Sequence, residues 1–155
     1  MQVRVAAPRD LDRLAALASL LFAHHASAGA RFALAPGREG ELRALLAGFA
    51  RDPLRALLVA EGEGGNLDGF VLASLVHRAG PFVESTRGEI DWLFVREDAR
   101  RRGAGRRLAA AALVWLGEQG ASRVEVHVER DNPGGRAFWD AQGFVPAMDV
   151  LERPL

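Results

Sequence analysis

The run of residues 95–108 restricts the fold of this chain more than any other stretch. Here a strand-like apolar segment ends, six Arg and two Gly follow, and a helical pattern begins. The first N–H groups of a helix lack partners and lie at the positive end of its dipole, so they favour an anion. Gly103 and Gly105 would let a pyrophosphate approach the backbone. The sequence therefore predicts a strand, an anion-binding loop and a helix in succession.

Two well-known nucleotide-binding loops do not match this spacing. A Walker-type loop needs Gly-Lys-Ser/Thr, and the chain has no Lys. A dinucleotide-binding fingerprint needs a third Gly where Leu108 stands, and it belongs to a first βαβ unit, whereas this loop comes late. A solvated, Arg-rich helix start remains the alternative. The glycine pair directly after a strand argues against that alternative.

Hydrophobic periodicity predicts an α/β fold. A first helix begins after Asp10 and frays over residues 24–29. The other predicted helices are 41–50, 103–119 and 133–141, and the predicted strands are 2–6, 56–61, 69–77, 89–95, 123–129 and 144–151. Three consecutive strands imply antiparallel pairing, and the later β-α-β unit implies a parallel step. The order β-α-α-β-β-β-α-β-α-β gives a mixed, mostly antiparallel sheet of about six strands with four helices. No composition shift divides the chain, so residues 1–155 are expected to form a single domain.

Composition excludes several classes of function. The 155 residues include no Cys, which excludes disulfides, thiolate metal sites and cysteine nucleophiles. The formal net charge is zero, so no overall field would attract nucleic acid or an anionic membrane. Residues 1–5 resemble a strand and not a signal peptide, and no apolar run would span a bilayer. We expect a cytoplasmic protein without a nucleic-acid or membrane partner.

Two motifs together point to a family. The spacing Arg100-x-x-Gly103-x-Gly105 resembles the Gln/Arg-x-x-Gly-x-Gly/Ala loop of the GNAT superfamily of N-acetyltransferases. Residues 132–144, Asn-Pro-Gly-Gly-Arg-Ala-Phe-Trp-Asp-Ala-Gln-Gly-Phe, are similar to its Asn-x-x-Ala-x-x-Phe/Leu-Tyr-x-x-x-Gly-Phe segment. The order of elements also agrees, so the resemblance covers nearly the whole chain. It implies the GNAT fold, in which the fourth and fifth strands splay apart.

The resemblance also implies acetyl-CoA as co-substrate. Pantetheine would lie between the splayed strands and pair with amides near Leu93 and Val95. The pyrophosphate would meet the loop formed by Arg100, Arg101, Arg102, Gly103, Ala104, Gly105 and Arg106. Asn132 matches an Asn that helps to hold the cofactor arm, and it also suits a plain helix N-cap. Trp139 would pack against the cofactor.

Chemistry at the amine requires a base, because an amine of pKa ~10.4 is almost wholly protonated at pH 7. Glu89 lies eleven residues before Arg100, where several members of the family carry a catalytic Glu. Strand alternation would place Glu89, Asp91, Leu93 and Val95 on one face and Ile90, Trp92 and Phe94 on the other. Glu89 is the first candidate for the base and Asp91 the second. The alternative is that Glu89 is a solvated residue where the strand begins.

Histidines are further candidates. His127 lies on the neighbouring strand and titrates in the right range, although a lone strand His is more often a surface residue. His24 and His25 would line the acceptor side, and a His pair alone is too little for a metal site. No metal is expected.

The proton donor departs from the family pattern. Many members use a Tyr to protonate the departing thiolate, whereas this chain has no Tyr and carries Trp139 at that position. An indole N–H has no useful acidity. A thiol has a pKa of ~8.5, so CoA could leave as thiolate with modest help. Without Cys, direct transfer within a ternary complex is favoured.

The sequence thus predicts acetyl transfer to a primary amine of a small molecule or a peptide N-terminus. One alternative is a non-catalytic acyl-CoA-binding module, and another is an interaction domain with an Arg-rich surface. The acceptor would meet the loops 24–37 and 79–88, which carry Phe32, Phe82, Glu84 and Arg87. Fold alone does not identify the acceptor. A homodimer is one outcome for the oligomeric state, which is left open.

Overall fold

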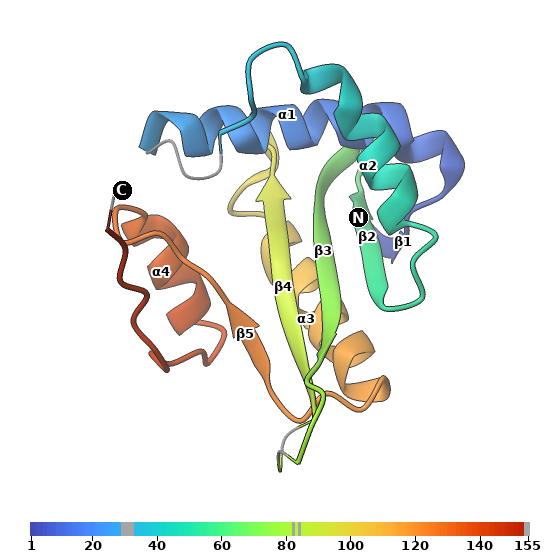
Figure 1. The fold of residues 1–155 in the computed structure, drawn as a ribbon. Coiled ribbons are helices and arrows are strands. Elements are labelled where there is room, and N and C mark those ends of the chain that lie inside the picture. Colours follow the sequence, from blue (N-terminus) through green and yellow to red (C-terminus); the bar gives the residue numbers. More distant parts are fainter. Residues whose placement is uncertain (29–32, 82, 84, 154–155) are drawn as a thin grey trace.

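In the computed structural model the chain forms a five-stranded mixed sheet flanked by four helices (Figure 1). The structure describes residues 1–28, 33–81, 83 and 85–153. The strands, which follow sequence order across the sheet, are β1 (Gln2–Val5), β2 (Arg55–Glu61), β3 (Leu67–His77), β4 (Thr86–Val95) and β5 (Val124–Val126). The helices are α1 (Leu11–Ala28), α2 (Leu42–Phe49), α3 (Ala104–Glu118) and α4 (Pro133–Asp140). The first four strands pair antiparallel, and β5 pairs parallel to β4.

Two hydrophobic layers enclose the sheet. On one face α1 and α2 bury a leucine-rich stripe, with Leu14 and Leu46 fully enclosed against β2 and β3. On the other face α3 presents Leu108, Ala109, Ala112 and Leu116, none of which is accessible to solvent. The alanines allow α3 to lie close to the sheet, and this is how the strand–loop–helix unit is fixed. Helix α4 adds Trp139 to this second layer.

The start of α1 is held by a buried carboxylate. Asp10 is fully enclosed and accepts a hydrogen bond from the Ala7 N–H. It also forms ion pairs with Arg4 at 2.6 Å and Arg13 at 2.8 Å. Arg4 contacts Glu61 as well, so one cluster ties β1, α1 and β2 together.

The predicted sixth strand is absent from the part of the chain described. Residues 144–151 take no strand conformation, although the sequence favours one. Pro146 has no N–H for a ladder, and Val145, Met148 and Val150 are exposed with no apolar face to cover them. The strand predicted at 123–129 is also shorter and forms only three residues of β5.

A β-bulge in β4 changes the predicted alternation of faces. Leu72 pairs with Trp92 and Ala73 with Ile90, so Asp91 is an extra residue without its own partner on β3. Ile90, Leu93 and Val95 consequently pack on the α3 side. The predicted face that joined Asp91 to Leu93 and Val95 is therefore wrong, because one inserted residue reverses the alternation beyond it.

Candidate active site

The central feature of the site is a fork between β4 and β5. The two strands pair at Gly88–Val124, Glu89–Glu125 and Ile90–Val126. Strand β4 then continues to Val95, while β5 ends at Val126 and leans away from it (Figure 1). The second half of β4 thus has no strand partner on its β5 side. Leu93 and Val95, predicted to meet pantetheine, lie on this unpaired half.

The loop at the upper end of β4 carries an uncapped helix start. After a short 3-10 turn at Glu97–Ala99, the backbone is left-handed at Arg101 (φ 62°) and at Gly103 (φ 84°). Helix α3 begins at Ala104, and no side chain caps it. Its first N–H groups are therefore available to an anion.

The two glycines of this loop differ in role. A Cβ at Gly103 would meet nothing within 4 Å, so this position is open. A Cβ at Gly105 would lie 3.3 Å from Phe138 and 3.6 Å from Val95. Gly105 therefore allows α3 to pack closely on α4 and β4, which the spacing in the sequence did not indicate.

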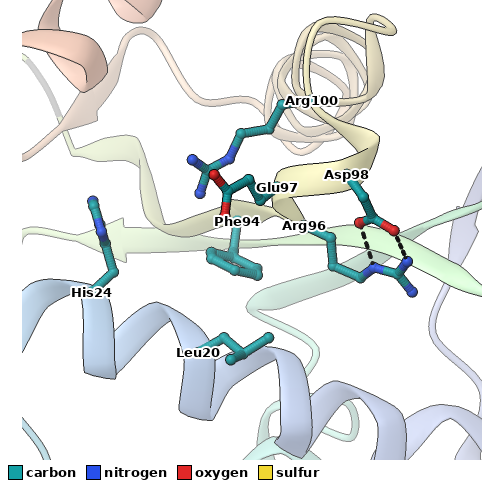
Figure 2. A pocket seen from close by; sticks show the side chains of 7 residues that line it. All are labelled: Leu20, His24, Phe94, Arg96, Glu97, Asp98 and Arg100. Carbon is teal, nitrogen blue, oxygen red and sulfur yellow. Dashed lines mark hydrogen bonds and ion pairs between the residues drawn. The ribbon is translucent and has the colours of Figure 1, made fainter.

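A hollow of about 340 Å³ lies beside the loop, between α1 and the end of β4 (Figure 2). Arg100 extends over it and donates through Nε to the Val95 carbonyl at 3.1 Å. His24 approaches from α1, and Arg96 is tied to Asp98 in an ion pair. The lining residues are Leu20, His24, Phe94, Arg96, Glu97, Asp98 and Arg100. The hollow lies at the end of β4 next to the loop before α3, whereas the candidate base Glu89 lies in the first half of the strand.

Glu89 lies at the base of the fork in contact with charged groups. Its Oε1 is 3.5 Å from Nδ1 of His127, and its Oε2 is 3.5 Å from a terminal nitrogen of Arg87. The side chain of Glu89 is 19% exposed and that of His127 is 61% exposed. The structure therefore brings together the first and third candidates for the base.

Asp91 occupies a more buried place at the bulge. The Ser74 hydroxyl donates to its carboxylate, and Ser74 itself is 5% exposed. Burial raises the pKa of Asp91, and the nearby charge of Glu89 raises it further. Two carboxylates two residues apart thus have different environments.

The end of α1 lies near the chain that follows β5. Burial lowers the pKa of His25, and His24 lowers it further, while the charge of Glu129 acts in the opposite direction. Since Glu129 follows β5, the end of α1 that carries His24 and His25 lies near the chain that leaves the fork after β5. Of the predicted acceptor residues, Phe32, Phe82 and Glu84 lie outside the described residues.

The fourth helix begins at Asn132 and packs through aromatic rings. The side chain of Asn132 accepts a hydrogen bond from the Gly135 N–H at 2.8 Å, so it caps α4. Trp139 is 7% exposed and meets the rings of Phe138 and Phe144 at centroid distances of 4.9 and 5.1 Å. Contact of either residue with a cofactor stays a prediction.

Comparison with known proteins assigns this geometry to a family. The model of the acetyltransferase (GNAT) family matches residues 17–144. The chain belongs to the GNAT acetyltransferase family. The predicted GNAT fold is thereby confirmed, with five strands in place of about six within the described residues.

Two curated relatives are mycothiol acetyltransferases. The one from Propionibacterium freudenreichii is 32% identical over 146 residues, which are 94% of this chain and 43% of that protein. The one from Beutenbergia cavernae is 39% identical over 79 residues, which are 51% of this chain and 26% of that protein. The GNAT chain described here thus spans less than half the length of these relatives.

Solved structures show the same fold over almost the full chain. A protein from Bacillus halodurans has a TM-score of 0.83 at 20% identity and covers 100% of this chain and 99% of its own. An aminoglycoside N-acetyltransferase in complex with CoA has a TM-score of 0.81 at 20% identity, with 99% and 93% covered.

Two contacts of this GNAT site were not foreseen from the sequence. Glu125 stands directly opposite Glu89, and Arg87 reaches both carboxylates. Only the register between β4 and β5 would have indicated this cluster.

Among the residues described, no three His, Asp or Glu side chains gather closely enough to hold a metal ion. Across the same residues, no helix combines the length and apolarity needed to cross a membrane.

Proposed function

We propose that this chain transfers an acetyl group from acetyl-CoA to a primary amine, either of a small molecule or of a peptide N-terminus. The observation that carries the proposal is the fork between β4 and β5, with Glu89 at its base and an open anion loop at its far end. One strand thus connects a candidate base to a candidate phosphate site. Val95 lies six positions after Glu89 along the strand, which is about 20 Å.

The residues present fit CoA at the loop before α3 and along the unpaired half of β4. The uncapped N–H groups of α3, the open position at Gly103 and the surrounding Arg side chains suit a pyrophosphate. The unpaired half of β4, including Leu93 and Val95, offers backbone groups to the amides of pantetheine. When bound, acetyl-CoA supplies an activated acetyl group as a thioester.

Glu89 would act on the amine. The carboxylate takes a proton from the ammonium, directly or through water, so that the nitrogen lone pair can attack the thioester carbonyl carbon. A C–N bond forms, the C–S bond breaks, the nitrogen releases its second proton to water, and CoA leaves as thiolate. The leaving thiolate needs little protonation, since the pKa of a thiol is ~8.5. Asp91 is the less suitable base because its carboxylate is already engaged by the Ser74 hydroxyl at the bulge.

The names of similar proteins support a small acceptor. Two relatives are named for the acetylation of mycothiol, and a structural neighbour is named for that of aminoglycosides. A floor with Glu89 and Asp91 suits an acceptor that arrives as a cation.

One observation favours a second candidate function. Trp139 stands where many GNAT members carry the proton-donating Tyr, and it is enclosed by aromatic rings. A chain that kept the fold and lost the acid would bind acyl-CoA without turnover.

A thiol-release screen separates these two functions. Acetyl-CoA is mixed with the protein and a panel of small amines, peptides and aminoglycosides, and free CoA is measured together with the mass of the product. We expect amine-dependent CoA release and a product heavier by one acetyl group. Binding of acetyl-CoA without transfer to any amine would favour the binding module, and absence of binding would refute both.

A further inference from the structure

Like charges meet at the base of the fork. Glu89 on β4 and Glu125 on β5 are direct partners in the parallel register, and each side chain is 19% exposed. Two carboxylates in this arrangement repel one another. The sheet needs a cation at this position, and the fold supplies one.

Arg87 lies between the two carboxylates. One terminal nitrogen is 3.5 Å from Oε2 of Glu89, and Nε is 3.4 Å from Oε2 of Glu125. Arg123, the residue before β5, approaches the same pair, but its ion pair at 2.7 Å is with Glu125. Arg87 therefore contacts the candidate base Glu89, whereas the ion pair of Arg123 is with Glu125.

The guanidinium of Arg87 has an unmet donor within the part of the chain that the structure describes. Its terminal nitrogen beside Glu89 is buried and has no hydrogen-bond partner among those residues. A buried, charged N–H without a partner is costly. A shift of less than about 1 Å toward Oε2 of Glu89 would give a charge-assisted hydrogen bond. Bonds of this kind often tighten only when substrate is bound.

None of the other described groups around Glu89 offers its carboxylate a permanent positive charge. Asp91 on the same strand is negative, and Ser74 on β3 is engaged with Asp91. On the opposite side stand Glu125 and His127. Arg55 on β2 acts on Asp91.

We propose that Arg87 is a positioning residue for acetyl transfer. It holds Oε2 of Glu89 and stabilises the charged carboxylate, so that Oε1 faces the fork and His127. This inference rests on the proposed function. In the reaction Oε1 takes the proton of the acceptor ammonium, while Arg87 keeps the carboxylate from turning toward bulk solvent. An adjacent cation favours the ionised form that a base requires.

The test compares Arg87→Gln with Arg123→Gln in the full chain. Both changes remove one arginine from the cluster, but only the first removes a contact to Glu89. The measurements are kcat and KM for acetyl-CoA and for an accepted amine from pH 5 to 9 (roughly the range in which the base is read), with melting temperatures alongside. Arg87→Lys, which keeps the charge but not the two-sided geometry, is the conservative variant.

We expect Arg87→Gln to lower kcat about tenfold at neutral pH and to displace the acid limb of the kcat profile toward higher pH. KM for acetyl-CoA should not change. Arg87→Lys should bring the acid limb most of the way back to its wild-type position. The pH profile of Arg123→Gln should match that of the wild type. A purely structural role would lower kcat equally at all pH values, in step with the melting temperature.

Profiles of Arg87→Gln and Arg123→Gln that superimpose would overturn the inference. If Arg87→Gln does not fold, an Arg87→Lys profile displaced no further than that of Arg123→Gln would overturn it equally. Glu89→Gln in the same assay separates the role of Arg87 from the proposed function. If the wild type transfers no acetyl group, the proposed function is refuted. If Glu89→Gln loses the acid limb of the pH profile while the profile of Arg87→Gln is not displaced, only the role of Arg87 is refuted.

Discussion

At the residue scale, the environments of Glu89 and Asp91 decide what each carboxylate can do. Asp91 is enclosed at the bulge, and burial together with the charge of Glu89 raises its pKa. Glu89 contacts Arg87 and His127 and reaches the open side of the fork. Strand alternation predicted these two carboxylates correctly as neighbours, but it missed the bulge that follows them. The bulge places Asp91 beside Ser74 and shifts the alternation beyond it, so that Leu93 and Val95 pack on the α3 side.

Trp139 provides a test at the same scale. Because it packs between Phe138 and Phe144, Trp139→Phe should keep most of the turnover with acetyl-CoA. The smaller ring leaves a cavity, and we expect a loss of about 1–3 kcal/mol in the free energy of unfolding. Turnover and chemical denaturation are measured together. A variant that is folded and binds acetyl-CoA but is inactive would show that the indole N–H has a catalytic role.

At the element scale, the loop before α3 is the feature that the sequence indicated best. Its Arg and Gly spacing predicted a strand, a loop and a helix start, and β4 and α3 confirm them. The bulge in β4 could not be foreseen, because it depends on tertiary pairing and Asp91 has no distinguishing local pattern. The strand predicted at 144–151 followed from the apolar residues there, although Pro146 was a local sign against it. Strand propensity reports local preference, whereas a ladder also needs a partner edge.

The two ends of α3 offer a matched pair of substitutions. Gly103 and Gly120 share a φ of 84°, and a Cβ at either would meet nothing within 4 Å. An Asp at either position therefore carries the same backbone strain. Only Gly103→Asp places a negative charge where the pyrophosphate would lie. We expect it to weaken acetyl-CoA binding at least tenfold, about 1.4 kcal/mol, and Gly120→Asp to leave binding unchanged, both by calorimetry. Equal affinities for the two variants would contradict the assignment of the loop.

At the scale of the whole molecule, the cluster around Asp10 should control acid stability. Arg4 holds the pKa of Asp10 at about 2, below its usual 3.8, with further help from the Ala7 N–H and Arg13 and against the opposing effect of burial. A depressed pKa stabilises the fold above pH 3.8, and this contribution is lost as the pH falls through 2. It amounts to about 2 kcal/mol.

The corresponding variant is Asp10→Asn. It should lower the free energy of unfolding by at least about 2 kcal/mol at neutral pH, because it removes the buried negative charge that Arg4 and Arg13 share. Between pH 4 and 2 (about the window of the shifted pKa) its stability should fall less steeply than that of the wild type. Asp12→Asn is the control, since the side chain of Asp12 is 80% exposed and forms an ion pair with the half-exposed Arg43. Equal acid sensitivity of Asp10→Asn and wild type, by urea denaturation, would be evidence against this cluster.

Two matched carboxylates at the base of the fork allow a decisive test of amine activation by Glu89. Glu89 and Glu125 are opposite each other, equally exposed, and both contact Arg87. CoA release from acetyl-CoA and an accepted amine is measured for Glu89→Gln and Glu125→Gln at neutral pH. We predict that Glu89→Gln loses ~10²–10⁴-fold in kcat with unchanged affinity for acetyl-CoA, and that Glu125→Gln stays within about threefold of the wild type. Equal losses in the two variants, or no loss in Glu89→Gln, would contradict the assignment of Glu89 as the base.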